Sequence, residues 1–352
     1  MSKISINLLL WNGERYLPFC LESLKKQSFS DWELNILNNG STDNSLKYLK
    51  EHYPQFRVNN LKQNIGFAKG HNKLISWTNS EYILCLNQDT ILESDFLKNA
   101  IEFLDQNKNI GAVSPKIYKW NFKKLDIENP PEPEMAGKML EIGKTNIIDS
   151  CGLKIFKNHQ VMDWGQLEKD NKKFSSAQSI FGVSGALPIY RRKTLEKIKI
   201  NNEYFDEDFF SYKEDVDLSY RIQLAGYKIY FLPQVIGYHD RSVSRDKSII
   251  QGRKIKTNWI KQYSYKNHLW CIVKNEFSKN LSKYFLPIFW YELKKFLYIL
   301  ILENKTLKFF LKNKKEYKKI KSKRKYIFKN IVKIKAEDLA KWYDQKQKNK
   351  KT

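Results

Sequence analysis

Carboxylates occur at two places in the sequence where they could do chemistry, and the first is the segment Asn87-Gln88-Asp89. It directly follows YILCL, an apolar stretch with the length and composition of a buried strand. A carboxylate at the end of such a strand can hold Mg²⁺ or Mn²⁺, which usually bind one or two carboxylates together with substrate phosphates. An ordinary turn or helix cap would use the same residues, so this motif alone leaves both interpretations open.

The second place is FDEDFFSYKEDVDLSYRIQLAGY, residues 205–227, where acids alternate with aromatic residues. The acids are Asp206, Glu207, Asp208, Glu214, Asp215 and Asp217. The helix macrodipole favours acids at a helix start, and capping could explain one of them. It does not explain the whole group. Crowded carboxylates beside apolar side chains are a common source of a general base, because burial and like charge raise their pKa.

His239 is the third candidate, in the segment GYHD after another predicted strand. A single histidine more often has a structural role. With Asp89 available as an oxygen ligand, His239 becomes a candidate metal ligand.

The elements that must position these residues alternate between strands and helices. Apolar patterns predict strands at 4–11, 32–37, 56–61, 82–86 and 111–118, and helices at 14–27, 41–53, 67–78 and from residue 94. The pattern is lost between 120 and 179, then predicts a regular segment at 180–190, a helix at 215–225 and a strand at 227–232. This order indicates an α/β protein with a mostly parallel sheet and helices on both faces. Ligands of such sheets bind beyond the carboxyl ends of the strands.

The composition of the 352 residues suits a large globular chain. Hydrophobic residues make up 41% and aromatic residues 14%, so wholesale disorder is excluded. The four cysteines are far apart and form no C-x-x-C pair, which argues against a disulfide framework or a zinc knuckle and favours a reducing compartment. The first eleven residues have strand length and lack the features of a secretory signal, so we expect a cytoplasmic protein.

The net charge of +25 is concentrated near the C-terminus. Residues 251–352 contain 29 Lys and Arg against 7 Asp and Glu, whereas the first 250 residues contain 34 against 31. Such a basic region suggests an anionic partner, either a phospholipid surface or a nucleic acid. A solvated lysine-rich tail is the alternative.

Residues 284–302 contain two apolar runs, FLPIFWY and FLYILIL, separated by Glu292, Lys294 and Lys295. A membrane-spanning helix needs about 20 mostly apolar residues, so neither run is long enough. The mixture of aromatic residues, leucines and lysines is typical of an interfacial helix, and the polybasic segment 312–325 would strengthen contact with an anionic membrane. The alternative is a helical subdomain that packs its aromatic residues on the rest of the protein.

Seven segments of the sequence resemble, in order, those of glycosyltransferase family 2 enzymes with the GT-A fold, in the rhamnosyltransferase-like branch of bacteria. The segments are WNGERYLPFCLESLKKQ, NNGSTDNS, NIGFAKGHN, LCLNQDTIL, GVSGALPIYRR, FDEDFFSYKEDVDLSYRIQLAGY and the segment around His239. They extend from residue 4 to 244, about two-thirds of the chain, and seven matches in order are difficult to obtain by chance.

This resemblance implies a role for each candidate residue. Asp89 and His239 would be metal ligands, with Asn87 in place of the first acid of a D-x-D motif, and Asp215 would be the catalytic base. The nucleotide-sugar pocket would contain Asn12, Glu14, Asn38, Asn64, Gly66, Asn72 and Asn87, and the acceptor site Glu214, Asp217 and Arg221. Asn38 occupies a position where the family usually has an aspartate for the nucleobase, which leaves the base preference open because an amide both donates and accepts.

The resemblance also implies an activity and a domain organisation. Residues 1–248 would form the GT-A domain, with a nucleotide-sugar half at 1–118 and an acceptor half at 119–248, and residues 249–352 a basic, mainly helical extension that associates with the inner face of the cell membrane. The expected reaction is an inverting, Mg²⁺- or Mn²⁺-dependent transfer of L-rhamnose from dTDP-rhamnose to a lipid-linked surface polysaccharide.

Three alternatives remain: a UDP- or GDP-hexose donor, an inactive relative that only binds nucleotide sugars, and a basic nucleic-acid-binding protein. Retention of Asp89, Asp215 and His239 argues against an inactive relative. No nucleic-acid module is recognised, so we expect no nucleic-acid partner. The sequence does not predict the oligomeric state.

Overall fold

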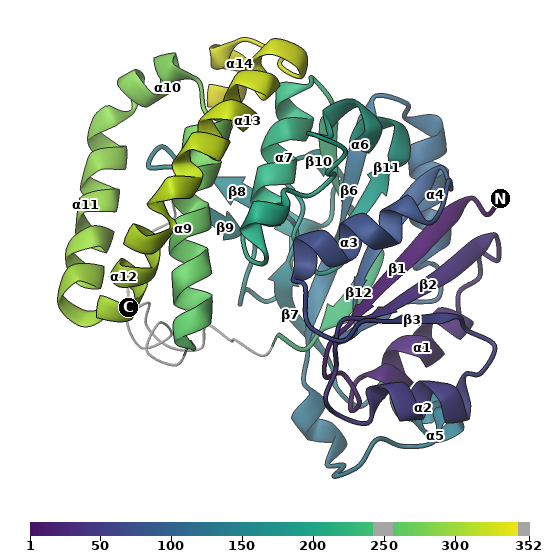
Figure 1. Cartoon of the computed structure of the whole chain (residues 1–352). Helices are drawn as coiled ribbons and strands as arrows, with labels where there is room; N and C mark the ends of the chain where they lie inside the picture. The colour runs from purple at the N-terminus through teal and green to yellow at the C-terminus, as the bar shows by residue number, and fades with distance from the viewer. Residues whose placement is uncertain (242–255, 344–352) are drawn as a thin grey trace.

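The computed structural model describes residues 1–241 and 256–343, so Ser244 and the domain boundary expected between 248 and 249 lie outside the described residues. Figure 1 shows a central sheet with helices on both sides and a group of C-terminal helices next to it. The mixed α/β architecture with a basic helical C-terminal region confirms the fold class expected from the sequence.

The first third of the chain follows the predicted alternation. Its elements are β1 (Ile4–Leu10), α1 (Leu17–Lys25), β2 (Trp32–Asn38), α2 (Ser45–His52), β3 (Val58–Asn60), α3 (Phe67–Ser76), β4 (Tyr82–Asn87), β5 (Thr90–Leu92), α4 (Phe96–Gln106) and β6 (Ile110–Trp120). Only β5, a short strand directly after Asp89, is missing from the sequence prediction. β5 pairs with β12 and so places Asp89 near the end of that strand.

The central part of the chain contains shorter elements. They are the 3₁₀ turn η1 (Phe122–Leu125), α5 (Pro133–Met139), β7 (Lys144–Ser150), β8 (Leu153–Ile155), β9 (Val161–Asp163), η2 (Lys172–Phe174), β10 (Gln178–Ser179), β11 (Ile189–Arg191), α6 (Arg192–Ile198), η3 (Glu207–Phe209), α7 (Glu214–Leu224) and β12 (Lys228–His239). The prediction of a regular segment at 180–190 is therefore mostly wrong. Only its end is a strand, because the preceding backbone forms a loop that contacts α7 through Val183 N–H and Ser219 Oγ.

The large sheet has the strand order β10-β12-β6-β11-β4-β1-β2-β3, with β5 paired to β12 and β7 paired to β6. Strands β1, β2, β3 and β4 are parallel to one another, and β12 is parallel to β6. Because β11 is antiparallel to both β4 and β6, these two strands point the same way. The central sheet is thus mostly parallel, as expected.

Side chains of β4 show how the sheet is buried on both faces. Ile83 and Cys85 enter one hydrophobic cluster, which also contains residues of α3, α6 and α7. Tyr82, Leu84 and Leu86 enter a second cluster with residues of α1, α2 and α4. This alternation is what a strand covered on both faces requires.

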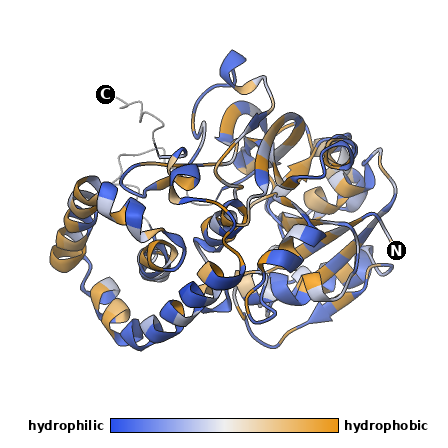
Figure 2. Ribbon diagram, turned by 90° about the horizontal axis from the view of Figure 1, so that it is seen from above, coloured by the Kyte–Doolittle hydropathy of each residue, from blue (hydrophilic) through white to orange (hydrophobic). Residues whose placement is uncertain are grey.

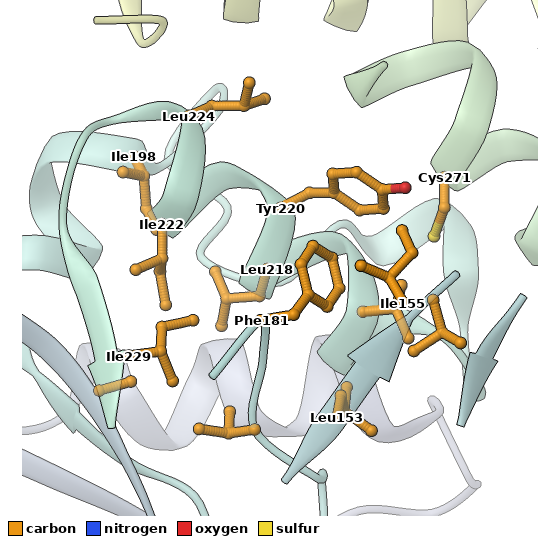
Figure 3. Close-up of a cluster of buried hydrophobic side chains, with 14 of the residues drawn as sticks. Leu153, Ile155, Phe181, Ile198, Leu218, Tyr220, Ile222, Leu224, Ile229 and Cys271 are labelled. Atoms are coloured by element: carbon orange, nitrogen blue, oxygen red, sulfur yellow. The ribbon is translucent and has the colours of Figure 1, made fainter. Parts of the chain in front are cut away.

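The C-terminal helices share the first of these clusters instead of forming a separate tail. They are α9 (Asn258–Asn275), α10 (Ser278–Lys283), α11 (Phe285–Leu302), α12 (Asn304–Lys312), the 3₁₀ turn η4 (Asn313–Glu316), α13 (Tyr317–Asn330) and α14 (Ala336–Ala340). Figure 3 shows Cys271 of α9 beside Tyr220 and Phe181 of this cluster. Ile320 and Ile327 of α13 are buried in the same cluster, where α9 packs on α7 and α13 packs on α9.

Candidate functional site

The ends of β4 and β12 bring two of the predicted metal ligands together. β5 pairs antiparallel with the end of β12, so that Thr90 lies opposite His239. As a result, Asp89 Oδ2 lies 3.4 Å from His239 Nε2, although 150 positions separate the two residues in the chain. Burial lowers the pKa of His239, but the carboxylates of Asp89 and Asp149 outweigh this effect and raise the pKa to about 10.

Three charged residues that the sequence analysis missed surround His239. Asp149 is near the end of β7, and its Oδ2 lies 2.9 Å from His239 Nδ1. Arg241 pairs with Asp149 at 2.9 Å and with Asp163, in β9, at 2.9 Å. Asp149 fixes the ring orientation of His239, an arrangement that often supports metal-ligating histidines. Arg241 directly follows the GYHD segment and could have been noticed, whereas Asp149 and Asp163 come from the stretch without a regular pattern.

The Asp89–His239 pair fits a divalent cation that is completed by other ligands. Adjacent ligands of an octahedral cation are about 3 Å apart, close to the separation of these two atoms. In residues 1–241 and 256–343, no group of three or more His, Cys, Asp and Glu side chains could hold a metal ion. Diphosphate oxygens and water would therefore have to supply the remaining ligands, as they commonly do for Mg²⁺.

The loops after β1 and β2 are joined by hydrogen bonds through two predicted pocket residues. Asn12 Oδ1 accepts from Thr42 N–H at 2.8 Å, and Glu14 accepts from the backbone N–H and side chain of Asn44 at 3.1 Å each. Asn12 has a φ of 49°, a left-handed conformation that asparagine tolerates better than most residues. These contacts fix a polar rim at the carboxyl ends of the parallel strands.

The other predicted nucleotide-pocket residues divide into two groups. Asn38, the last residue of β2, donates to Asn60 Oδ1 at 2.6 Å. In the loop after β3, Asn64 accepts from Gly66 N–H at 2.8 Å. Asn72 instead donates to Phe205 O and accepts from Phe205 N–H, both at 2.8 Å. Asn72 therefore connects α3 to the acidic segment, and we propose that it has this positioning role in place of contact with the nucleotide.

Asn87 lies at the end of β4, and its neighbour Gln88 connects this strand to β1. Gln88 donates to Trp11 O and accepts from Trp11 N–H, both at 2.8 Å. Gly13 is packed so closely against Gln88 that an added Cβ would lie 2.5 Å from its side-chain atoms. Gln88, which the sequence analysis did not single out, thus sets the distance between the loops that follow β1 and β4.

Asp215 is in the first turn of α7 and receives two backbone hydrogen bonds. Its Oδ2 accepts from Gly185 N–H at 3.1 Å, and its Oδ1 accepts from Val216 N–H at 2.8 Å. Burial raises the pKa of Asp215, nearby Lys213 lowers it, and the net shift is upward. Gly185 is followed by Ala186, whose carbonyl oxygen accepts from Asn87 N–H at 3.3 Å, so Asp215 is connected to the end of β4.

Glu214 differs from its neighbour Asp215 in its environment. Glu214 is buried, and its Oε2 has no hydrogen-bond partner among the described residues. Burial, followed by the charge of Asp215, raises the pKa of Glu214 well above its ordinary value. Because backbone N–H groups favour an ionised carboxylate, Asp215 is better suited than Glu214 to carry the charge.

Lysines of the C-terminal helices neutralise most of the other acids in this segment. Lys274 pairs with Asp206 and, at 2.8 Å, with Asp217. Lys323 pairs with Asp206 and, at 2.9 Å, with Asp208. Glu207 lies 3.7 Å from Lys69. Glu214 and Asp215 are the two acids of the group without an ion pair in the part of the chain that the structure describes.

Asp217 and Arg221 are fully buried and pair with each other at 3.1 Å. Arg221 also donates to the carbonyl oxygens of Ile198 and Tyr204 at 2.8 and 2.6 Å. Side chains that are enclosed in this way cannot reach an acceptor sugar. We therefore propose that Asp217 and Arg221 anchor α7, in place of the acceptor-binding role expected from the sequence.

The loop before α7 adopts an unusual backbone conformation that α9 stabilises. Phe210, Tyr212 and Lys213 have φ values of 60°, 71° and 71°, which are unfavourable for residues other than glycine. Asn267 of α9 is fully buried, and its Nδ2 lies 2.8, 3.0 and 2.7 Å from the carbonyl oxygens of Phe209, Ser211 and Tyr212. Asn267 therefore fixes the loop that sets the start of α7 and the position of Asp215.

Comparison with known proteins gives relatives that match this architecture. A synthase of poly-β-1,6-N-acetyl-D-glucosamine from Staphylococcus epidermidis is 24% identical over 235 residues, covering 66% of this chain and 48% of that protein. The synthase of the same name from Staphylococcus aureus strain COL is 23% identical over 233 residues, covering 65% and 48%. The chain thus spans about half the length of the curated relatives it matches.

A solved structure supports the fold. The crystal structure of GalNAc-T7 with UDP, GalNAc and Mn²⁺ has a TM-score of 0.56 and 12% sequence identity, and the match covers 80% of this chain and 49% of that one.

The family model described as glycosyl transferase family 2 matches residues 5–199, more than half of the chain. This range includes the polar rim after β1, β2 and β4 and the segment that carries Asp89. The chain therefore belongs to glycosyl transferase family 2.

Proposed function

We propose that this protein is a metal-dependent, inverting glycosyltransferase in which Asp215 is the general base. Asp215 takes the proton of the acceptor hydroxyl as its oxygen forms a bond to the anomeric carbon. The bond from that carbon to the diphosphate breaks at the same time, and the nucleoside diphosphate leaves with the electron pair. A single displacement inverts the configuration, through a transition state with oxocarbenium character.

The observation that carries this proposal is the convergence of two separate carboxylate motifs. The Asp89–His239 pair lies where β4 and β12 end. Asp215 is connected to the same end of β4, because it accepts from Gly185 N–H and the next residue, Ala186, accepts from Asn87 N–H at 3.3 Å. A bound Mg²⁺ or Mn²⁺ would supply positive charge for the departing diphosphate. Asp89 and His239 would hold the ion, and Asp149 would keep the His239 ring in place.

We propose L-rhamnose from dTDP-rhamnose as the donor, as the resemblance to the rhamnosyltransferase-like branch implies. The second candidate is a UDP- or GDP-linked hexose, and the names of the curated relatives favour an N-acetylglucosamine donor. Asn38 is compatible with either donor, since its amide both donates and accepts. A thermal-shift panel of dTDP-rhamnose, UDP-N-acetylglucosamine and GDP-mannose, each with and without Mn²⁺, would distinguish these donors. Stabilisation by none of them would contradict the proposed activity.

We further propose that the acceptor is a lipid-linked glycan at the inner face of the cell membrane. The basic C-terminal region supports this proposal, because lysines attract a negatively charged membrane surface. None of the helices in residues 1–241 and 256–343 has the length and apolar character needed to cross a bilayer.

Substitution of Asp89 by alanine is expected to abolish Mn²⁺-dependent binding of the donor. The variant loses the carboxylate that pairs with His239 and would hold the cation. Isothermal titration with nucleotide sugar, with and without Mn²⁺, measures the effect. Asp95→Ala is a suitable control, because Asp95 precedes α4 and contacts Ser28. Full turnover of the wild-type protein in excess chelator would contradict the metal dependence.

Substitution of Asn267 by alanine is expected to lower kcat by about tenfold or more while the donor Kd stays within about twofold. The loop before α7 loses its donor to three carbonyl groups, so Asp215 is held less well. Asn280→Ala is a matched control, since Asn280 is also buried and donates to Ala336 O at 2.9 Å, away from this loop. Both variants should lose stability, but only Asn267→Ala should lose turnover. Equal kcat in the two variants would show that Asn267 has a purely structural role.

A further inference from the structure

Helix α11 exposes its apolar face, whereas an ordinary surface helix buries it. Its outward face is apolar, and of its 18 residues only Ile299 is buried. Nine large apolar side chains on it are between 40% and 72% exposed: Phe285, Leu286, Phe289, Trp290, Phe296, Leu297, Leu300, Ile301 and Leu302. Nineteen large hydrophobic side chains are exposed in the described residues, so nearly half of them belong to this one helix. Figure 2 shows α11 as a hydrophobic helix at the edge of the molecule.

Two of the three charged residues that interrupt the apolar sequence are turned toward the protein. Glu292 Oε1 lies 2.7 Å from His268 Nε2 on α9, and Lys295 lies over the rings of Tyr265 and Tyr291 at 5.4 and 4.9 Å. Of the three charges between the two apolar runs, only Lys294 is exposed. The runs therefore join into one continuous stripe, contrary to the separation that the sequence suggests. A helix of 18 residues gives this stripe a length of about 27 Å.

The exposed charges within residues 278–315 are all positive. Eight lysines between residues 278 and 315 are exposed: Lys279, Lys283, Lys294, Lys305, Lys308, Lys312, Lys314 and Lys315. The two acids in this interval, Glu292 and Glu303, are not exposed. An apolar stripe between cationic side chains matches a surface with an apolar interior and anionic headgroups.

We propose that α11 lies in the plane of an anionic phospholipid bilayer, with its exposed apolar stripe in the boundary between headgroups and acyl chains and the surrounding lysines among the phosphates. This inference deepens the proposed function and rests on its membrane-bound acceptor, because it names the element that would dock on the membrane. A second copy of this chain is a poorer occupant. A symmetric contact through α11 would bring two sets of lysines together, which is unfavourable.

Flotation of the full chain with vesicles tests the proposal without any sugar substrate. The test variant is Leu286→Gln, Trp290→Gln and Ile301→Gln combined, which removes apolar surface without changing charge. Trp77→Gln is the matched control, since Trp77 is 42% exposed at the end of α3, outside the stripe. Unchanged thermal midpoints and donor binding would show that the fold and the donor site are intact.

The wild-type protein and Trp77→Gln are expected to float with phosphatidylglycerol-containing vesicles at moderate salt and to bind pure phosphatidylcholine weakly. The triple variant should need at least about 100-fold more lipid, because each large apolar side chain contributes a factor of about ten or more when buried. Equal binding of the triple variant would overturn the proposal. The proposal would also be overturned if the wild-type protein sediments as a dimer and does not bind vesicles, whereas the triple variant sediments as a monomer. Turnover of a water-soluble acceptor, measured in parallel, reports on the sugar-transfer proposal independently.

Discussion

Asp215→Asn is expected to reduce turnover by about 10² to 10⁴-fold, which corresponds to about 3 to 5 kcal/mol of activation free energy. The amide keeps the shape of the side chain but cannot take the proton of the acceptor hydroxyl. The affinity for the donor should survive, since Asp215 is on α7 and the proposed donor loops follow β1, β2 and β4. The measurement is kcat with the donor Kd determined in parallel.

Glu214→Gln is the matched variant at the neighbouring position. Burial and the charge of Asp215 raise the pKa of Glu214 well above its ordinary value, which favours the neutral form, and glutamine has nearly the same size as that form and no charge. Successive residues of a helix point about 100° apart, so only one of the two carboxylates can face the acceptor. We expect the Glu214→Gln enzyme to retain most of its kcat. An inactive Glu214→Gln enzyme beside an active Asp215→Asn enzyme would reverse the assignment of the base.

The pH dependence of kcat provides a second check on Asp215. Burial raises its pKa, and a general base must be deprotonated to act, so kcat should fall on the acidic side at a pH above the ordinary pKa of an aspartate, about 4. The Asp215→Asn variant should lose this acidic limb. If the limb persists in the variant with the same midpoint, another group is the base.

Much of the first third of the fold was predictable because each element has a strong local pattern. β4 is a continuous apolar run, and the turn after β2 carries residues that end one element and begin the next. The pairing of β5 with β12 was not predictable in this way, since a three-residue strand has too few residues to show a pattern. The proximity of Asp89 and His239 therefore came from the family resemblance and not from residue spacing.

The charge distribution of the sequence did not predict where the lysines of the C-terminal region lie in the fold. Lys274 and Lys323 look like any other lysines in a basic segment, yet they are buried partners of the acids that precede α7. The number of acids in 205–227 is thus explained partly by lysines far along the chain. Asn267 has no recognisable signal in the sequence, because its role depends on a loop conformation that only the folded structure shows.

Lys274→Met is expected to destabilise the folded protein by about 3 to 5 kcal/mol, the usual cost of removing one partner from a buried ion pair. Lys274, Asp206 and Asp217 have almost no exposed surface, and the Lys274 ammonium contacts both carboxylates. Methionine fills a similar volume but leaves the carboxylates with less positive charge. The measurement is the free energy of unfolding from urea titration, with Lys279→Met as control, because the Lys279–Glu337 pair is largely exposed and should contribute little to stability.

Neutralising Asp206 should rescue part of this loss. Burial raises the pKa of Asp206, but Lys274 and Lys323 outweigh it and lower the pKa below its ordinary value. The Asp206 contribution to stability is therefore complete above the unfolded pKa of about 4 and is lost as the pH falls below it. Lys274→Met should weaken this acid dependence, and adding Asp206→Asn should recover part of the stability at pH 7, because Asp217 still has Arg221 and Lys323 still has Asp208 as a partner. If the double variant is no more stable than Lys274→Met alone, the cost comes from lost packing around α9 and not from the unpaired charge of Asp206.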